Sequence, residues 1–296
     1  MNEYWIIGHP LSFALTTPVM NGMFDRLGFG GNFQTKNVSP EELGEAMEKV
    51  RRGELAGLVT TMPHKTPSIA YLQNKSDSVQ KINAVNLILP CERTVEAEDS
   101  SDASLVGANP GTPENPATLC GHNTDWKGAQ GAVKSAMPNL EGKHALVLGA
   151  GGAARAAAYG LKEAGAIVSI WNRTPERAKA FAEKLEIQWV EDLKNWASQA
   201  KPQLIINATS ISYQSKQSSL VPFPLWEKVE LALDAVYGNT SLFLEEAKAA
   251  QVEIALSGEH WFLHQFLPMF KVITGQDAPP EFVIELIKEA QRLKDA

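Results

Sequence analysis

A glycine-rich turn between an apolar run and an alanine-rich stretch is the feature that most constrains the fold. Residues 145–148 are apolar, and Gly149, Gly151 and Ala154 follow in a Gly-x-Gly-x-x-Ala pattern. In such a strand–turn–helix unit the first glycine permits a tight turn, the second lets the backbone approach a pyrophosphate, and the alanine allows close packing. The first helical amides are unpaired and attract phosphate. The pattern predicts a dinucleotide site at Gly149, Ala150, Gly151, Gly152 and Ala153.

The strand that follows this turn indicates which dinucleotide is bound. Residues 166–171 end at Asn172, near where an NAD site usually has a carboxylate for the ribose 2′-hydroxyl. Arg173 and Arg177 follow, and two guanidinium groups with the Thr174 hydroxyl suit a doubly charged 2′-phosphate. The same residues also fit an ordinary helix start, with Thr174 as N-cap, and both interpretations can hold together. The sequence therefore predicts NADP as the cofactor.

Length and composition limit the class of protein. The chain has 296 residues, 44% of them hydrophobic and 21% charged, which predicts a globular protein of two domains. A net charge of −7 without a dense basic stripe argues against nucleic-acid binding. We recognise no signal peptide or membrane-spanning segment, so we expect a cytoplasmic protein without a membrane partner. Cys91 and Cys120 lack metal-ligand spacing; we expect no metal and two free thiols, with a disulfide as the alternative.

Strand-like and helix-like segments alternate along most of the chain, which indicates α/β domains with mostly parallel sheets. Residues 90–118 interrupt this alternation, because they are rich in Glu, Asp, Ser, Pro and Gly, and they predict a long loop. The predicted strands cover residues 4–7, 32–38, 58–62, 87–89, 145–148, 166–171, 203–207 and 231–236. The predicted helices include residues 18–27, 40–52, 259–273 and 280–293.

Short polar motifs occur in a fixed order along the chain, and together they carry a family resemblance. They are Gly8-x-Pro10, Thr60-Thr61-Met62-Pro63-His64-Lys65, Ala84-Val85-Asn86, Gly121-x-Asn123-Thr124-Asp125, Asn172-Arg173-Thr174, Asn207-Ala208-Thr209, Asp234-x-Val236-Tyr237, and Gly258 followed by Gln265. Through these eight motifs the chain resembles the shikimate dehydrogenase family, from residue 8 to about residue 275.

The resemblance implies an α/β fold of two domains. Residues 1–124 would form a substrate domain with a mostly parallel sheet, completed by C-terminal helices within 259–296, and residues 125–258 a Rossmann-type NADP domain across a cleft. The implied reaction is reversible hydride transfer between nicotinamide and a ring alcohol of shikimate, which gives 3-dehydroshikimate, or of a close analogue such as quinate. The implied partner is a small cyclic hydroxy acid, bound by a monomer or homodimer.

The resemblance also implies a role for each motif. Lys65 and Asp125 would be the catalytic pair, because an ammonium group can stabilise a developing alkoxide, while a carboxylate orients the lysine and shares a substrate hydroxyl. The sequence leaves open which of the two moves the proton. Outside this context Lys65 would be a solvated loop lysine, and Asp125 an ordinary first-turn carboxylate that faces the helix dipole. His64 and His122 would line the pocket wall or face solvent. The implied substrate ligands are Thr61, Asn86, Tyr237 and Gln265, and the further cofactor residues are Asn207, Ala208, Thr209 and Gly258.

The first loop departs from the family pattern. The two serines that usually bind the substrate carboxylate are Ala14 and Thr16 here, and an Asn ahead of the catalytic lysine is Val59. A missing hydrogen-bond partner costs on the order of 1–3 kcal/mol. Thr16 keeps a hydroxyl, and Ser12 or Thr17 is a further candidate ligand. These changes favour weak activity on shikimate, or a preference for quinate or another hydroxy acid.

Two other functions stay open. A methylenetetrahydrofolate-type dehydrogenase also uses a lysine in its cleft, but the motif Asn123-Thr124-Asp125 argues against it. A non-catalytic NADP-binding regulator would explain Ala14, but the retention of Lys65 argues against it. A further departure lies after Gly258, where the family's Leu-x-Met segment is Glu259-His260-Trp261.

Overall fold

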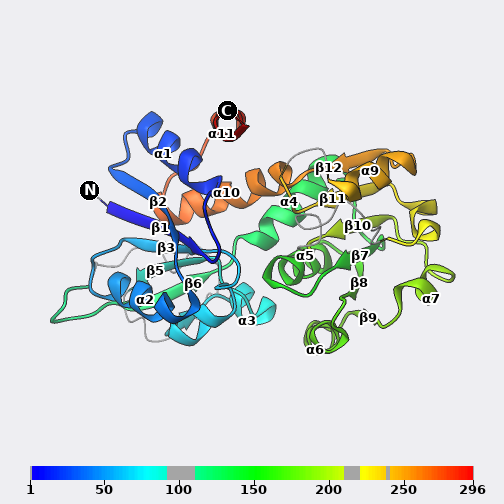
Figure 1. Ribbon diagram of the computed structural model, residues 1–296, viewed down its shortest axis with the longest axis horizontal. Helices are drawn as coiled ribbons and strands as arrows, with labels where there is room; N and C mark the ends of the chain where they lie inside the picture. The colour runs from blue at the N-terminus through cyan, green and yellow to red at the C-terminus, as the bar shows by residue number, and fades with distance from the viewer. Residues whose placement is uncertain (1, 92–110, 210–220, 238–240, 296) are drawn as a thin grey trace. The chain divides into compact units, whose positions relative to one another are not determined.

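The computed structural model describes residues 2–91, 111–209, 221–237 and 241–295, and the chain forms two units (Figure 1). The first unit comprises Met1–Thr124 and Phe266–Ala296, and the second comprises Asp125–Gln265. Residues 259–265, expected in the first unit, belong to the second, because helix α10 (Gly258–Thr274) begins in one unit and ends in the other.

The first unit is built on a six-stranded sheet of order β2-β1-β3-β5-β6-β4. Strand β1 pairs in parallel with β2 and β3, whereas β5 is antiparallel to both of its neighbours. The expected mostly parallel sheet is confirmed, with β5 as the exception. The strands are β1 (Asn2–Gly8), β2 (Gly31–Asn37), β3 (Gly57–Thr60), β4 (Asn74–Lys75), β5 (Leu87–Cys91) and β6 (Thr118–His122).

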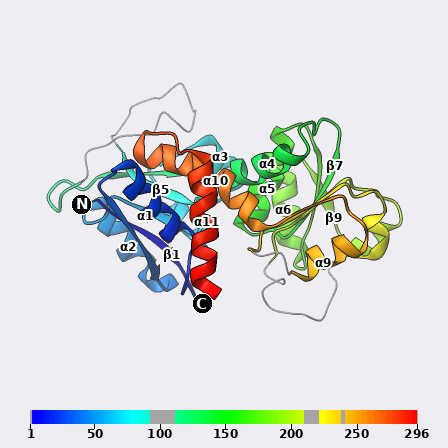
Figure 2. The same cartoon turned by 90° about the horizontal axis from the view of Figure 1, so that it is seen from above.

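The C-terminal helix packs beside the first helix of the chain, which completes the first unit (Figure 2). The side chain of Leu286 fills the space next to Gly22, and Arg26 forms an ion pair of 2.7 Å with Glu285. The helical elements of this unit are α1 (Thr16–Leu27), η1 (Pro40–Glu42), α2 (Leu43–Arg51), η2 (Pro67–Tyr71), α3 (Asp77–Ile82) and α11 (Pro280–Asp295).

The second unit is built on a six-stranded sheet whose strand pairs are all parallel, in the order β12-β11-β10-β7-β8-β9. This is a doubly wound Rossmann order, and ligands bind such sheets at the carboxyl ends of the strands where the order reverses, here between β7 and β10. The expected Rossmann-type unit is confirmed. The strands are β7 (His144–Leu148), β8 (Ile167–Trp171), β9 (Gln188–Val190), β10 (Leu204–Asn207), β11 (Leu231–Asp234) and β12 (Ile254–Leu256).

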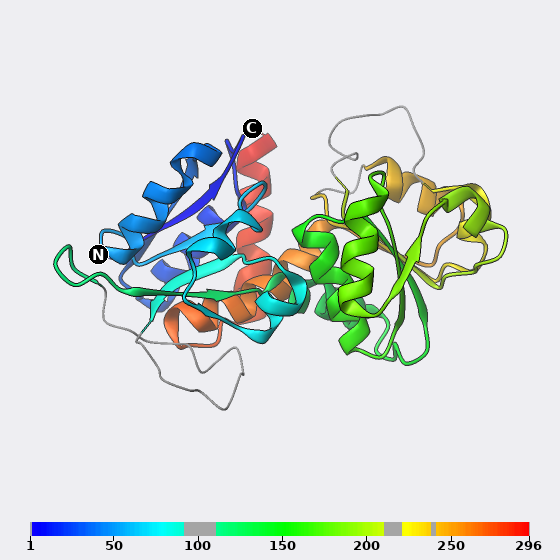
Figure 3. The ribbon, with the colours of Figure 1, turned by 90° about the horizontal axis from the view of Figure 1, so that it is seen from below.

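Helices cover both faces of the second sheet. Helices α5 and α6, drawn in green, lie side by side on one face, where Arg155 of α5 stands over the ring of Phe181 of α6 (Figure 3). A buried apolar cluster that includes Leu193, Leu225 and Phe243 covers the other face. The helical elements of this unit are α4 (Asp125–Ala136), α5 (Gly152–Glu163), α6 (Pro175–Leu185), α7 (Leu193–Ala197), η3 (Phe223–Lys228), α9 (Leu242–Ala249) and the first turns of α10.

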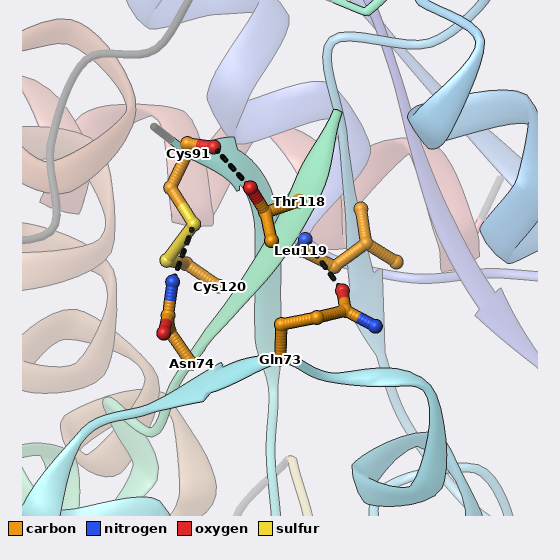
Figure 4. The surroundings of a disulfide bond; sticks show 6 residues. All are labelled: Gln73, Asn74, Cys91, Thr118, Leu119 and Cys120. Atoms are coloured by element: carbon orange, nitrogen blue, oxygen red, sulfur yellow. Dashed lines mark hydrogen bonds between the residues drawn. A yellow bond between two sulfur atoms is a disulfide. The ribbon is translucent and has the colours of Figure 1, made fainter. Parts of the chain in front are cut away.

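A disulfide joins Cys91 to Cys120, so the expectation of two free thiols is wrong (Figure 4). The antiparallel register places Cys120 opposite Leu89 and Cys91 opposite Thr118. The two Cα atoms are 5.7 Å apart, a separation that a disulfide spans. Asn74 donates a hydrogen bond of 3.4 Å to the sulfur of Cys91. The pairing depends on the register of two strands, and the spacing of the cysteines in the sequence does not reveal that register.

The long loop expected over residues 90–118 is shorter at both ends, because β5 includes Pro90 and β6 begins at Thr118. Residues 92–110 of this loop lie outside the described residues. Within the described ranges, no helix is both long and apolar enough to cross a membrane. The same part of the chain contains no group of three His, Cys, Asp or Glu side chains arranged to hold a metal ion.

Candidate active site

The loop that carries Lys65 begins at the carboxyl ends of β1 and β3, two inner strands of the first sheet. The N–H of Thr61 donates to the carbonyl of Ile7 at 2.9 Å, which continues the pairing of β1 and β3. The carbonyl of Lys65 accepts from the N–H of Val85 at 2.8 Å. The backbone of Lys65 therefore lies next to the segment that leads into Asn86, so the structure brings these two predicted site residues together.

Asn86 is fully buried and holds the segment that precedes α4. Its Nδ2 donates to the hydroxyl of Thr124 at 2.9 Å, and its Oδ1 accepts from the backbone N–H of Thr124 at 2.8 Å. The neighbouring Asn123 donates to the carbonyl of Ala84 at 2.8 Å. Thr124 directly precedes Asp125, so these bonds fix the chain one residue before the predicted catalytic carboxylate. From the sequence, Thr124 stands out only as a member of the motif that contains Asp125 and, with Asn123, as a possible helix cap.

His64 and His122 are both fully buried, so the solvent-facing alternative for them is wrong. Nε2 of His64 lies 2.7 Å from the carbonyl of Val38. A carbonyl can only accept, so this nitrogen must carry the proton. The N–H of Ser68 donates in turn to the carbonyl of His64 at 3.1 Å. His64 therefore anchors the loop on which Lys65 lies.

The loop that departs from the family pattern places its three hydroxyl candidates, Ser12, Thr16 and Thr17, in different environments. Ser12 is exposed, whereas Thr16 is the first residue of α1 and is buried. The hydroxyl of Thr17 lies 2.7 Å from that of Thr35 on β2, so these two side chains hydrogen-bond to each other. Between Ser12 and Thr16, Ala14 is partly buried and offers no polar atom on its side chain.

The turn after β7 has the geometry that a pyrophosphate site requires. Gly149 has a φ of 113°, and a Cβ there would lie 2.9 Å from the carbonyl oxygen of Ala208, so only glycine fits. At Gly151 no atom lies within 4 Å of the position that a Cβ would take, so the approach to the backbone is open. Ala154 is fully buried against the turn. These features leave room for phosphate at the N-terminal amides of α5.

The turn after β8 presents the residues predicted to bind a 2′-phosphate. Thr174 occupies the N-cap position of α6 with Pro175 after it, as the helix-start interpretation predicts, but the Thr174 side chain makes no capping hydrogen bond. Instead, Nδ2 of Asn172 donates to the carbonyl of Thr174 at 2.9 Å and orders the turn. Arg173 and Arg177 are both exposed. The turn therefore presents two exposed guanidinium groups beside a hydroxyl that the cap does not use.

A third guanidinium group, which sequence reasoning missed, lies between α5 and α6. The Arg155 guanidinium stands 6.0 Å from the ring centre of Phe181. Burial and the positive charge of Arg177 both lower the pKa of Arg155, with burial the larger cause. Arg155 directly follows the last residue of the glycine pattern. Its position adds positive charge to the side of the sheet where the predicted phosphate residues lie.

Two buried polar side chains connect the carboxyl ends of β10 and β11. Asn207 donates to Asp234 at 3.2 Å, and its Oδ1 accepts from both the N–H and the hydroxyl of Thr209 at 3.1 and 2.8 Å. Oδ1 of Asp234 also accepts from the N–H of Val236 at 3.1 Å. The Ala208 N–H pairs with the end of β7. The predicted cofactor residues 207–209 thus lie where the strand order reverses, and Asp234 supports them.

The start of α10 brings together several predicted residues of the second unit. Tyr237 is 39% exposed, and its ring meets that of Phe262 edge to face at 6.1 Å. A Cβ on Gly258 would lie 2.9 Å from the Tyr237 ring, so the glycine allows α10 to begin against this tyrosine. Asp125, the first residue of α4, is buried, and its backbone carbonyl accepts from the indole of Trp261 at 2.9 Å.

A cavity of about 710 Å³ lies beside the predicted 2′-phosphate residues. Asn172 and Arg173 form part of its wall, and Trp171, Phe223 and Trp226 supply apolar surface. The turn after β8 is therefore bordered by a broad apolar recess within the second unit.

Comparisons with known proteins match both units. A model described as the shikimate dehydrogenase substrate binding domain matches residues 6–88, and one described as shikimate / quinate 5-dehydrogenase matches residues 131–217. The shikimate dehydrogenase (NADP(+)) of Aquifex aeolicus is 30% identical, over 93% of this chain and 92% of its own length. A shikimate dehydrogenase (NADP(+)) of Thermus thermophilus is 32% identical, over 98% of this chain and 99% of its own length.

Solved structures agree with the sequence comparison. The crystal structure of a Thermus thermophilus shikimate 5-dehydrogenase in complex with NADP(H) and shikimate has a TM-score of 0.80 and 30% identity, and it covers 98% of this chain and 100% of its own. The Aquifex aeolicus shikimate dehydrogenase structure has a TM-score of 0.80 and 27% identity, with 97% of each chain covered.

Proposed function

The chain belongs to the shikimate dehydrogenase family, and we propose that it is an NADP-dependent dehydrogenase that interconverts shikimate and 3-dehydroshikimate by hydride transfer. The support is the full-length similarity to NADP-dependent relatives, one of which has NADP(H) and shikimate in its crystal structure. The single observation that carries the proposal within this chain is the turn at Gly149, with its left-handed glycine and the open approach above Gly151.

The residues of the second unit fit NADP. The N-terminal amides of α5 would bind the pyrophosphate. Arg173, Thr174 and Arg177 would bind the 2′-phosphate, because hydrogen bonds from a charged guanidinium group to phosphate are strong. When bound, the nicotinamide accepts or returns the hydride. No carboxylate stands directly after β8 to repel the 2′-phosphate, because that position is Asn172.

Lys65 and Asp125 are the proposed acid–base pair. Oxidation of a secondary alcohol removes the hydroxyl proton while hydride leaves the same carbon. In the reverse direction the carbonyl oxygen gains negative charge, which the Lys65 ammonium would stabilise and protonate. The Asp125 carboxylate would orient the ammonium and accept a hydrogen bond from the substrate. Asn86, Thr61, Tyr237 and Gln265 are the residues proposed to orient the ring hydroxyls.

The proposed substrate is shikimate or a close analogue such as quinate. Ala14 removes one of the two hydroxyls that the family uses for the carboxylate, and Val59 removes an amide. Of the hydroxyls that remain in this loop, that of Thr16 is on a buried residue and that of Ser12 on an exposed one. We therefore expect either a raised KM for shikimate or a preference for quinate.

A panel of cyclohexane hydroxy acids, assayed with NADP and with NAD, tests this function. We expect NADP reduction with shikimate or quinate. Lys65→Ala should abolish turnover while NADPH still binds, and Lys75→Ala, which removes an exposed lysine of β4, is the matched control. Wild-type turnover in Lys65→Ala would contradict the acid–base assignment. The absence of turnover by the wild-type protein across the whole panel would contradict the function and favour a non-catalytic NADP-binding regulator.

A cytoplasmic location and a monomeric or homodimeric state complete the proposal. The disulfide is the one observation that argues against a cytoplasmic location, because such bonds persist mainly in oxidising compartments. Both cysteines are buried, so the direct test is alkylation of Cys91 and Cys120 after the cells are quenched with acid and the protein is denatured, with and without prior reduction. Labelling without prior reduction supports a cytoplasmic location, and labelling only after reduction contradicts it. Light scattering on the purified protein distinguishes a monomer from a homodimer.

A further inference from the structure

A tryptophan at the start of α10 is bonded to the backbone of Asp125. Trp261 is 4% exposed, and its Nε1 donates a hydrogen bond of 2.9 Å to the main-chain carbonyl of Asp125. Asp125 is itself 2% exposed, so bulk water does not compete for this bond. The indole N–H is therefore held in a hydrogen bond to the first residue of α4.

Helices α4 and α10 approach each other closely at Gly128. A Cβ on Gly128 would lie 2.4 Å from Cδ1 of Trp261 and 2.7 Å from Cβ of Gln265, too close to fit without a shift. Trp261 and Gln265 are four residues apart and so lie on one face of α10. The absence of a side chain at Gly128 thus makes room both for the indole and for the glutamine proposed to orient the substrate.

The hydrogen bond depends on a residue that departs from the family pattern. Trp261 stands where the family pattern described above, through the resemblance, has Met. A thioether sulfur has no hydrogen to donate, so a methionine there cannot make this bond. The carbonyl of a first helical residue also accepts within its own helix, and its second lone pair is available to the indole. The indole therefore makes a contact to the backbone of Asp125 that a methionine at this position could not make.

We propose that Trp261 is a positioning residue for Asp125. It does not touch the reacting atoms. It fixes the orientation of the first peptide plane of α4, and with it the direction in which the Asp125 carboxylate leaves the helix. Proton transfer requires hydrogen-bond reach, and a misplacement of a fraction of an ångström already lowers the rate. This inference rests on the proposed function, in which Asp125 is one of the acid–base pair.

Two substitutions of Trp261 and one control test the proposal. Trp261→Phe keeps an aromatic ring but removes the N–H, and Trp261→Met restores the usual family residue. The control is Trp196→Phe, because Trp196 lies on α7 of the same unit, packs against the apolar cluster that includes Leu193 and does not line the cavity beside Arg173. For each protein we would measure kcat, both KM values and the thermal midpoint. The kcat is normalised to the number of NADPH-binding sites, so that misfolded protein does not count.

We expect both Trp261 variants to lose about tenfold in kcat, with the KM for NADP within twofold of wild type. We expect the control to keep its kcat even where its thermal midpoint falls. A normalised kcat within twofold of wild type in Trp261→Phe overturns the inference, as does an equal loss in the control. If the wild-type protein turns over no hydroxy acid, the proposed function is overturned and the inference with it. Turnover by wild type with an unchanged Trp261→Phe overturns the inference alone.

Discussion

Removal of the Cys91–Cys120 disulfide should destabilise the first unit by an amount that its loop length sets. The two cysteines are 29 positions apart, so the bond closes a loop of that length in the unfolded chain. The chain-entropy relation gives about 3.6 kcal/mol at 25 °C for such a loop. With a urea dependence of about 2 kcal/mol/M, the unfolding midpoint of the first unit should fall by about 1.8 M.

The variant for this measurement is Cys91→Ala with Cys120→Ala. Cys120 is fully buried, and a serine there would bury a new hydroxyl at a cost of about 1–3 kcal/mol, which would obscure the loss of the bond. Reduction of the wild-type protein should give the same shift as the double substitution. Reduction of the double variant is the control and should change nothing.

The assay must read the two units separately. The chain has seven tryptophans, and Trp5 is the one that lies in the first unit, so intrinsic fluorescence reports mainly on the second. Peptide-resolved hydrogen exchange along a urea series follows Leu87–Cys91 and Thr118–His122 directly. The fluorescence midpoint should stay in place. A decrease of less than about 1 kcal/mol in the free energy of unfolding of the first unit would refute the reasoning, because the closed loop would then not restrain the unfolded chain.

Four substitutions test the cofactor turn, the 2′-phosphate residues, the carboxylate loop and a half-buried histidine. Gly149→Ala should abolish NADPH binding in calorimetry, because its Cβ would lie 2.9 Å from the Ala208 carbonyl at a φ of 113°; retained affinity would contradict the site. Arg173→Asp should weaken NADP far more than NAD, and an equal loss would refute the 2′-phosphate assignment. Ala14→Ser should lower the KM for shikimate, and an unchanged KM would show that this loop does not bind the carboxylate. Burial and the neighbouring His260 lower the pKa of His264 from 6.5. The unfolded state therefore takes up the proton first, and the free energy of unfolding falls as the pH drops below about 6.5. His264→Gln should flatten this pH dependence in urea titrations at about pH 5 to 7.

The parts of the fold that depend on local pattern could be predicted from the sequence. The run of apolar residues before Gly149 and the glycine spacing predict β7, the turn and α5, because each depends on neighbours within a few positions. The disulfide could not be predicted with the same reasoning, because it depends on the antiparallel register of β5 and β6. The antiparallel direction of β5 could not be predicted either, because periodicity predicts a strand but not its direction.

The site shows the same division between local and distant information. The Asn-Thr-Asp motif identifies Asp125 as a candidate because it is a contiguous pattern. The residues that fix its backbone are distant in sequence: Asn86 is 38 positions from Thr124, and Trp261 is 136 positions from Asp125. Asn86 and His64 could be singled out by their motifs, but their partners Thr124 and Val38 follow only from the sheet.

The backbone around Asp125 is held from both sides, and this arrangement distinguishes its carboxylate from an ordinary first-turn aspartate. Thr124 is fixed through its N–H and its hydroxyl by Asn86, and the carbonyl of Asp125 is fixed by Trp261. A first-turn aspartate that serves only the helix dipole needs neither constraint, because the dipole tolerates a mobile carboxylate. A group that transfers a proton does need them, because its rate depends on placement within a fraction of an ångström. Asn86→Ala should therefore lower kcat as Trp261→Phe does. Asn86 is also proposed as a substrate ligand, so if Asn86→Ala changed only the KM for the substrate, it would act as a ligand alone and not as a support for Asp125.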